Sequence, residues 1–358
     1  MPPISLMLKP ASGKCNLRCK YCFYHDVASN REIKDKGFLS DELLDTILKK
    51  AFEYADGKQV LINFQGGEPL LSGKTFMRGV VSKIKEINKK GSPVFLGLQT
   101  NGTLIDDEWC EIFKENNFLV GLSLDGDKIA NKNRVDINGV EVFDKILNAA
   151  KLLEKHNVEF NILSVLTAEN AVHIDRIYSF FKKEGLKKLQ FIPCLKPLNE
   201  EVEDESFYLD SKSYETFLIK AFALYKQDMA SGNYVSIRQF DNFVNLAHFQ
   251  RAEQCGMNGY CTHQFVIEAD GTVYPCDFYC IDEYCLGNIK DSSFSELEHS
   301  KIAMDFIKES LETPDKCKKC EFYMLCRGGC KRERKDIDKC EAYKTFFKLA
   351  IPHLKRMS

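Results

Sequence analysis

The sequence predicts an α/β protein, a partial TIM-type barrel of six β/α units followed by a smaller cysteine-rich domain. Over the first two-thirds of the 358 residues, short β-rich runs alternate with longer amphipathic stretches. From about Ile237 onward the pattern changes to short strands, turns and eight clustered cysteines. A hydrophobic fraction of 44% is enough for a substantial core.

The predicted strands and helices follow one another regularly along the chain. Strands are expected at 5–9, 60–64, 94–99, 119–124, 159–165 and 188–192, and helices at 40–54, 74–88, 106–115, 142–156 and 171–184. Ser40 and Asp106 are good N-terminal helix caps, and an acidic residue follows each. Because β/α units of this kind form parallel sheets, functional loops are expected after the C-terminal ends of the strands.

A domain boundary is expected near residue 235. An acidic stretch at 199–210 and a helix at 214–229 precede it. The barrel would therefore span residues 1–235, and the second domain, with a C-terminal helix, residues 236–358.

Charge and hydropathy exclude several classes of protein. The net charge is −2 and both signs are interspersed, so nothing points to nucleic acid or to an anionic membrane as partner. The start, MPPISLMLKP, lacks the features of a signal peptide, and no stretch approaches a membrane span. The sequence therefore predicts a cytoplasmic protein.

Fifteen cysteines are far more than an intracellular protein usually has. Disulfides do not persist in a reducing compartment, and the count is odd, so metal ligation is the better interpretation. Four isolated cysteines are interpreted as small buried hydrophobic residues, namely Cys110, Cys194, Cys280 and Cys285.

The first group of cysteines follows the first predicted strand. Cys15, Cys19 and Cys22 have the spacing C-x3-C-x2-C, with Tyr21 just before the last. A structural zinc site normally has four closed ligands, and a 4Fe–4S cluster usually takes four cysteines. The fourth position is therefore open, unless His25 completes a zinc site.

This spacing resembles the signature of the radical S-adenosylmethionine (SAM) superfamily. The resemblance implies a 4Fe–4S cluster bound by three cysteines, with the fourth iron chelated by the amino and carboxylate groups of SAM. Reductive cleavage of SAM then yields a 5′-deoxyadenosyl radical. In such enzymes the cofactor carries the chemistry, and the protein positions it and excludes side reactions.

A second motif, FQGGEP, ends the second predicted strand. In the family this stretch holds the methionine amino group of SAM, and its glycines permit close backbone approach. Alone, a Gly-Gly pair after a strand is an ordinary turn, but the two motifs together favour the superfamily over a zinc site. Within the two motifs, the residues expected at the cofactor are Tyr21, Gln65, Gly66, Gly67 and Glu68.

Further cofactor contacts are implied by the resemblance at or after the ends of later strands, at Gln99, Asn101, Ser123, Arg134 and Leu195. Ser123 and Arg134 would bind the ribose and the carboxylate of SAM, and Leu195 the adenine. Taken alone, Asn-Gly and Asp-Gly pairs are common turns, and a lone arginine is usually solvated.

The second group of cysteines resembles the SPASM extension of radical enzymes that modify peptides and proteins. Eight thiols can close two four-cysteine clusters. By the family's arrangement, the first auxiliary 4Fe–4S cluster takes Cys255, Cys261, Cys276 and Cys330, and the second takes Cys317, Cys320, Cys326 and Cys340. The spacing alone also permits a pair of zinc knuckles, but an attached radical domain favours clusters, which can move electrons.

Over essentially the whole chain the sequence resembles the anaerobic sulfatase-maturating enzymes, which oxidise a cysteine or serine of a target sulfatase to Cα-formylglycine. The oxidation needs a hydrogen-atom acceptor, a base and an electron sink. These roles are expected of the deoxyadenosyl radical, of Asp277 directly after Cys276, and of the auxiliary clusters. Tyr24 is a second candidate near the reacting centre. Without the family, Asp277 would be interpreted as a carboxylate that only hydrogen-bonds the cluster loop.

The resemblance implies two partners, an unfolded sulfatase segment held in a groove by main-chain pairing and an electron donor such as ferredoxin or flavodoxin. The alternative enzyme is another SPASM peptide modifier, one that forms thioether crosslinks or matures a peptide. Such enzymes often carry an N-terminal recognition domain, whereas the first strand predicted here begins within ten residues of Met1. A zinc-stapled binding module is the alternative outside the enzymes.

Overall fold

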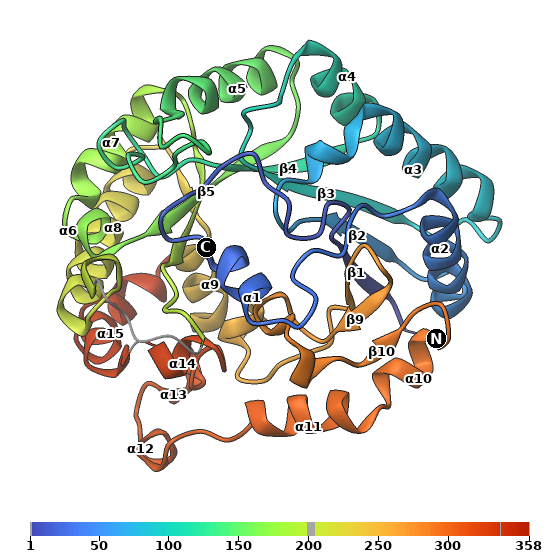
Figure 1. The fold of residues 1–358 in the computed structure, drawn as a ribbon. Coiled ribbons are helices and arrows are strands. Elements are labelled where there is room, and N and C mark those ends of the chain that lie inside the picture. The colour runs from blue at the N-terminus through green and yellow to red at the C-terminus, as the bar shows by residue number, and fades with distance from the viewer. Residues whose placement is uncertain (1, 199–204, 337, 358) are drawn as a thin grey trace. The chain divides into compact units, whose positions relative to one another are not determined.

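Two compact units make up the chain in the computed structural model, which describes residues 2–198, 205–336 and 338–357 (Figure 1). The first unit comprises Met1–Ser123, Arg134–Phe160 and His263–Phe306, and the second Leu124–Asn133, Asn161–Thr262 and Ile307–Ser358. The predicted boundary near residue 235 stays a prediction. Part of the predicted acidic stretch, residues 199–204, lies outside the described residues.

The strands of the first unit lie in the order β10-β9-β8-β1-β2-β3-β4. They are β1 (Ile4–Leu8), β2 (Val60–Phe64), β3 (Val94–Thr100), β4 (Phe118–Ser123), β8 (Val266–Ile267), β9 (Thr272–Tyr274) and β10 (Gly287–Asn288). Strands β1 to β4 are parallel, so their C-terminal ends lie at one edge of the sheet. Strand β8 also runs parallel to β1, which brings the chain after Ile267 to the same edge.

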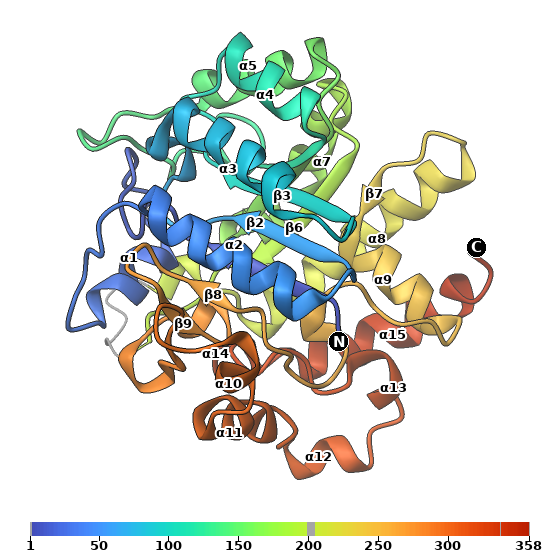
Figure 2. The ribbon, with the colours of Figure 1, turned by 90° about the vertical axis from the view of Figure 1, so that its right-hand side faces the viewer.

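Helices cover this sheet, and Figure 2 shows α2 and α3 packed over β2 and β3. The helices that begin in this unit are α1 (Phe23–Ser29), α2 (Asp41–Ala55), α3 (Gly73–Ile87), α4 (Asp107–Glu115), α5 (Phe143–Lys155), α10 (Phe294–Glu298) and α11 (Lys301–Ser310), with 3-10 turns η1 (Pro69–Ser72), η4 (Asp277–Tyr279) and η5 (Asp282–Tyr284). Both predicted caps are confirmed, because Ser40 Oγ accepts from Leu43 N and Asp106 Oδ1 accepts from Trp109 N.

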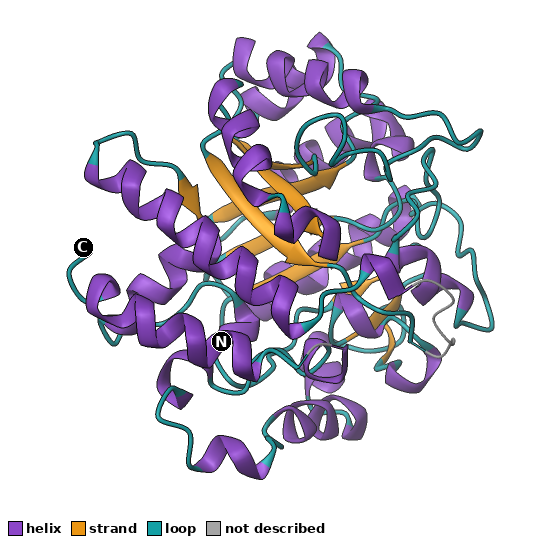
Figure 3. Ribbon diagram, turned by 90° about the vertical axis from the view of Figure 1, so that its left-hand side faces the viewer, coloured by secondary structure: helices purple, strands orange, loops and turns teal. Residues whose placement is uncertain are grey.

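The second unit contains three short parallel strands and most of the remaining helices. The strands are β5 (Phe160–Leu166), β6 (Lys188–Pro193) and β7 (Ser236–Ile237). The helices are α6 (Ala168–Val172), α7 (Ile174–Lys183), α8 (Ser211–Ala230), α9 (Arg238–Ala247), α12 (Asp315–Lys318), α13 (Tyr323–Cys326), α14 (Glu333–Asp336) and α15 (Cys340–Leu354), with 3-10 turns η2 (Glu205–Phe207) and η3 (Cys255–Met257). Figure 3 distinguishes these strands and helices by colour.

Aromatic rings from α8, α9 and α15 form the core of the second unit. The ring of Phe222 lies 5.3 Å from the rings of Phe240 and Phe346. Apolar burial of this kind holds α15, whose first residue is Cys340, against α8 and α9.

The six predicted barrel strands all exist, with ends displaced by no more than one residue. One predicted helix differs. The helix expected at 171–184 is split into α6 and α7, because the backbone of His173 leaves helical values at φ −101° and ψ 22°. Thr167, whose side chain accepts from Asn170 N, starts the helical run earlier than expected. Within the part of the chain that the structure describes, no helix is long and apolar enough to cross a membrane.

Candidate active site and cluster sites

The three N-terminal cysteines lie in the loop between β1 and α1, where Cys22 is the N-cap residue of α1. Asn101, which follows β3, donates from Nδ2 to Cys15 Sγ over 3.8 Å and to Asn16 Oδ1 over 2.9 Å. Burial raises the pKa of Cys15 to about 12, and the nearby Cys22 and Cys19 add to the effect. The cysteine loop is therefore tied through Asn101 to the end of β3.

The FQGGEP motif lies against this cysteine loop. Glu68 N donates to Lys14 O over 2.8 Å. Gly67 has a φ of +51°, and a Cβ at this position would lie only 2.1 Å from Lys14 O. A side chain at residue 67 would therefore collide with the backbone beside Cys15, so the second glycine is needed for the two motifs to meet.

The carboxylate of Glu68 joins the second motif to the turn after β3. It is fully buried and accepts from Thr100 Oγ1 and Asn101 N, each over 2.8 Å, and from Leu70 N over 3.0 Å. Burial raises the pKa of Glu68 to about 7, although these hydrogen bonds oppose the shift. Its contacts in the structure are thus positioning contacts, and its predicted contact with the cofactor stays a prediction.

Two other predicted cofactor residues meet at one place in the first unit. The Arg134 guanidinium lies 5.6 Å from the centroid of the Tyr21 ring, and Arg134 is buried. Ser123, at the end of β4, is also buried, and Gln99 is half-buried in β3. Leu195 is buried after β6 in the second unit. The roles given to these residues stay predictions.

Asp277 lies where the sequence predicts a base, directly after Cys276 at the start of η4, and it is only 5% exposed. Its Oδ2 accepts from Tyr24 Oη over 2.6 Å and from Gln65 Nε2 over 3.1 Å. Gln65 Nε2 also donates to Tyr24 Oη. The structure therefore brings both predicted catalytic residues together with a residue of the FQGGEP motif.

Tyr24 is a hydrogen-bond donor in this group. Burial raises its pKa well above the ordinary value, and the charge of Asp277 raises it further. The phenol therefore stays protonated, and Asp277 is the better candidate for the base.

The sequence did not predict three buried charged residues that form a chain of ion pairs ending at Asp277, namely Arg31, Glu268 and Lys9. The Nζ of Lys9 lies 3.0 Å from Asp277 Oδ1. A signal for Lys9 was present in the sequence, because it is the last residue of the first predicted strand, 5–9, and functional side chains are expected at the C-terminal ends of the strands.

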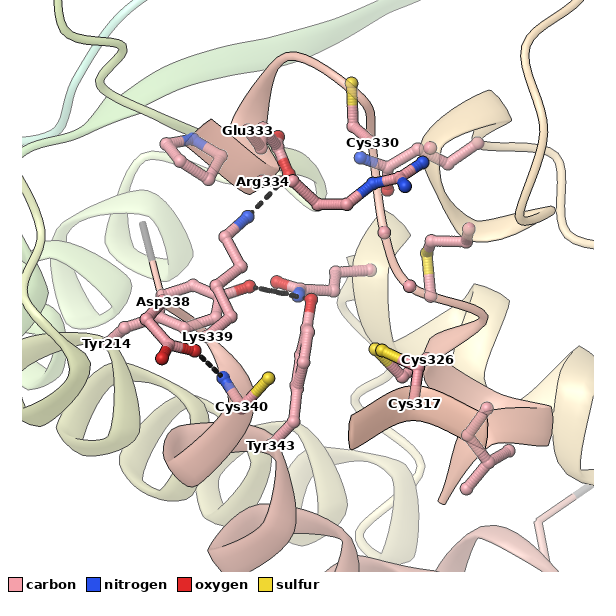
Figure 4. Close-up of a pocket in the computed structure, with 18 of the residues that line it drawn as sticks. Tyr214, Cys317, Cys326, Cys330, Glu333, Arg334, Asp338, Lys339, Cys340 and Tyr343 are labelled. Carbon is pink, nitrogen blue, oxygen red and sulfur yellow. Dashed lines mark hydrogen bonds and ion pairs between the residues drawn. The ribbon is translucent and has the colours of Figure 1, made fainter. Parts of the chain in front are cut away.

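A cavity of about 230 Å³ lies within the second unit. Among its lining residues are four predicted cluster ligands, Cys317, Cys326, Cys330 and Cys340 (Figure 4). Burial raises the pKa of Cys326 to about 11, and Cys340, Cys317 and Cys320 contribute. Cys317, Cys326 and Cys340 are predicted ligands of one cluster and Cys330 of the other, and thiols that line a cavity fit the ligand chemistry of 4Fe–4S clusters.

The other predicted auxiliary ligands are divided between the units. Cys255, Cys261 and Cys330 belong to the second unit and Cys276 to the first. Burial raises the pKa of Cys330 to about 12, with a contribution from Cys255. A Cβ on Gly256 would lie 3.0 Å from that of Cys330, so these two segments are in close contact. The division of the eight cysteines between two clusters stays a prediction.

His25 and the four isolated cysteines are the last of the residues considered in the sequence. His25 is exposed on α1. Among residues 2–198, 205–336 and 338–357, no three His, Cys, Asp or Glu side chains are placed to hold a single metal ion. Of the four isolated cysteines, Cys110, Cys194 and Cys280 are buried, as interpreted, and Cys285 is partly exposed.

Two known protein families match the regions that contain the N-terminal motifs and the C-terminal cysteines. Residues 10–181 match the model of the radical SAM superfamily, and residues 255–321 match SPASM, an iron–sulfur cluster-binding domain. The chain is therefore a radical SAM enzyme with a SPASM domain, and the predicted α/β fold class is confirmed.

Individual relatives show to which family of radical SAM enzymes the chain belongs. The cysteine-type anaerobic sulfatase-maturating enzyme of Clostridium novyi (strain NT) is 47% identical over 99% of this chain and 97% of that protein. The serine-type enzyme of Bacteroides thetaiotaomicron is 30% identical over 98% and 90%. The structure of native anSMEcpe with bound AdoMet and Cp18Cys peptide matches with a TM-score of 0.94 at 43% identity, covering 99% of this chain and 98% of that one. The chain belongs to the anaerobic sulfatase-maturating enzymes.

Proposed function

We propose that this enzyme oxidises a cysteine in an extended segment of a target sulfatase to Cα-formylglycine. The observation that carries the proposal is the contact of Asp277 with Tyr24 and Gln65, which places a buried carboxylate beside both SAM motifs. The choice of cysteine over serine is supported by the identity of 47% with a cysteine-type relative against 30% with a serine-type one. The Cp18Cys peptide bound to anSMEcpe supports a peptide segment as the substrate.

The proposed cofactors are SAM and three 4Fe–4S clusters. When bound, they supply a 5′-deoxyadenosyl radical and sites for the removed electron. The proposed ligands of the first cluster are Cys15, Cys19 and Cys22, those of the second are Cys255, Cys261, Cys276 and Cys330, and those of the third are Cys317, Cys320, Cys326 and Cys340. The cavity beside Cys326 and Cys340 supports the third site.

The role of this chain's own residues is to hold the substrate thiol and take its proton. The substrate Cβ would give one hydrogen atom to the 5′-deoxyadenosyl radical, Asp277 would accept the thiol proton, and one electron would pass to the bound auxiliary clusters. The resulting thioaldehyde adds water and releases H₂S, which leaves the aldehyde. Tyr24 and Gln65 donate to Oδ2 of Asp277, and the ammonium of Lys9 lies 3.0 Å from Oδ1, so each carboxylate oxygen has a neighbouring side chain that would orient it.

The proposed reductant is a low-potential protein such as ferredoxin or flavodoxin. The proposed compartment is the cytoplasm, because its reducing conditions keep the fifteen cysteines available as thiols.

A peptide assay tests the proposed function. Reduced, reconstituted enzyme with SAM is expected to convert a sulfatase-motif cysteine peptide to an aldehyde, seen as a mass decrease and as a hydrazone after trapping. The matched serine peptide is expected to react more slowly. Formation of deoxyadenosine without any peptide aldehyde would refute the proposal.

Metal analysis tests the proposed number of clusters. Protein purified and reconstituted without oxygen is expected to contain about twelve iron and about twelve sulfide per chain, because each of three clusters holds four of each. Replacement of Cys340 by Ala is expected to lower both values by about four. Zinc without a visible chromophore would contradict the assignment.

A further inference from the structure

We propose, on the basis of the function proposed above, that Lys9 is a positioning residue whose buried ammonium orients Asp277 and is held by Glu268 and Arg31. Lys9 Nζ lies 3.0 Å from Asp277 Oδ1 and 3.8 Å from Glu268 Oε1. Arg31 Nη1 donates to the same Glu268 oxygen over 2.5 Å. All four side chains are buried.

This group joins two cationic side chains to two carboxylates. Lys9 and Arg31 supply two positive charges, and Glu268 and Asp277 supply two negative ones. Burial alone would lower the pKa of Lys9, but the negative charge of Asp277, with that of Glu268, raises it above its usual range. Lys9 therefore remains a cation next to the proposed base.

Strand pairing brings these charges together. Leu8 of β1 is opposite Ile267 of β8, and Lys9 N donates to Ile267 O over 2.9 Å. The parallel register thus places Lys9 beside Glu268, the first residue after β8.

The side chain of Lys9 also contacts the FQGGEP motif and Tyr24. A Cβ on Gly66 would lie 2.8 Å from both Cγ and Cδ of Lys9, so this glycine makes room for the lysine stem. The Nζ lies 4.8 Å from the centroid of the Tyr24 ring. A single side chain therefore touches the SAM motif, the base and the tyrosine that donates to the base.

Stability alone does not account for this arrangement. Arg31 Nε and Glu268 Oε2 are buried and have no hydrogen-bond partner among the described residues. Buried ion pairs often add no more stability than apolar side chains of similar volume. An ammonium that orients Asp277 would explain why Lys9, Glu268 and Arg31 are charged and buried here.

The test compares Lys9→Met, the double variant Lys9→Met/Glu268→Gln and the control Lys36→Met in the reconstituted holoenzyme. Lys36 is a matched control, because its buried ammonium pairs with Asp270 Oδ2 over 3.0 Å and does not contact Asp277. The measurements are formylglycine formed per deoxyadenosine, KM for the cysteine peptide, and thermal stability.

Lys9→Met is expected to lower the yield of formylglycine per deoxyadenosine by about tenfold to a hundredfold, because the base is no longer aligned. KM is expected to stay the same, and Lys36→Met is expected to keep the wild-type yield. The double variant removes the unbalanced charge, so it is expected to regain thermal stability but not the yield. This separates positioning from a purely structural role.

Two results would overturn the inference. One is a wild-type yield in Lys9→Met, and the other is a double variant that regains the yield together with its stability. Asp277→Asn, measured in parallel, distinguishes this failure from that of the proposed function. If Asp277→Asn makes formylglycine at the wild-type rate, the proposed base is wrong. If Asp277→Asn is impaired but the Lys9 variants keep the wild-type yield of formylglycine, Asp277 remains the proposed base and the positioning role of Lys9 is wrong.

Discussion

Replacement of Asp277 by Asn is expected to lower the rate of formylglycine formation by about 10²- to 10⁴-fold, the usual contribution of a general base. The amide has nearly the same volume, but it cannot take the substrate proton. It also removes the nearer of two negative charges that face the buried ammonium of Lys9, which lies 3.0 Å from Asp277 Oδ1 and 3.8 Å from Glu268 Oε1. The measurement is single-turnover kinetics of peptide oxidation without oxygen, with deoxyadenosine formation followed in the same samples.

Asp270→Asn is the control for this experiment. Asp270 lies in the same unit and pairs with Lys36, but it does not touch Tyr24, Gln65 or Asp277. We expect the control to oxidise the peptide at close to the wild-type rate. An Asp277→Asn enzyme with wild-type turnover would show that another group takes the proton.

Gly67→Ala is expected to abolish most SAM cleavage. The added Cβ would lie 2.1 Å from Lys14 O, a backbone atom next to Cys15, so the motif or the cysteine loop must move. The φ of +51° adds strain of about 1–2 kcal/mol for a residue with a side chain. We expect deoxyadenosine formation to fall by at least about a hundredfold, since a displacement of the reacting groups by about 1 Å can cost that much.

Gly73→Ala is the control that distinguishes the effect of the collision with Lys14 O from the effect of a side chain at positive φ. Gly73 also has a positive φ, +87°, but a Cβ there would meet nothing within 4 Å. We expect this control to lose some thermal stability and to keep SAM cleavage. If Gly67→Ala cleaves SAM as well as Gly73→Ala does, the close approach of the two motifs is not required.

The sequence predicted the fold well because its signals are local. The run Val60–Phe64 forms a buried strand, and Ser40 and Asp106 cap the helices that follow them directly. Each of these features depends on residues only a few positions apart in the sequence. The split between α6 and α7 was missed because it depends on one residue, His173, whose type does not indicate a break.

The sequence predicted those parts of the candidate site that consist of short motifs. The cysteine loop and the FQGGEP motif were recognised by their spacing and by resemblance, and Asp277 by resemblance alone. Lys9 and Glu268 were missed because their contact depends on the parallel pairing of β1 with β8, segments far apart in the sequence. Glu68 was expected at the cofactor, and nothing in its local sequence showed that its carboxylate holds Thr100 and Asn101.

The central claim is that this enzyme removes a hydrogen atom from the Cβ of a cysteine in a sulfatase-type peptide. The most direct test uses a peptide whose target cysteine carries two deuterium atoms on Cβ. We expect one deuterium to appear in 5′-deoxyadenosine for each aldehyde formed, and the other to remain on the aldehyde carbon. Aldehyde formation with unlabelled deoxyadenosine would contradict the account.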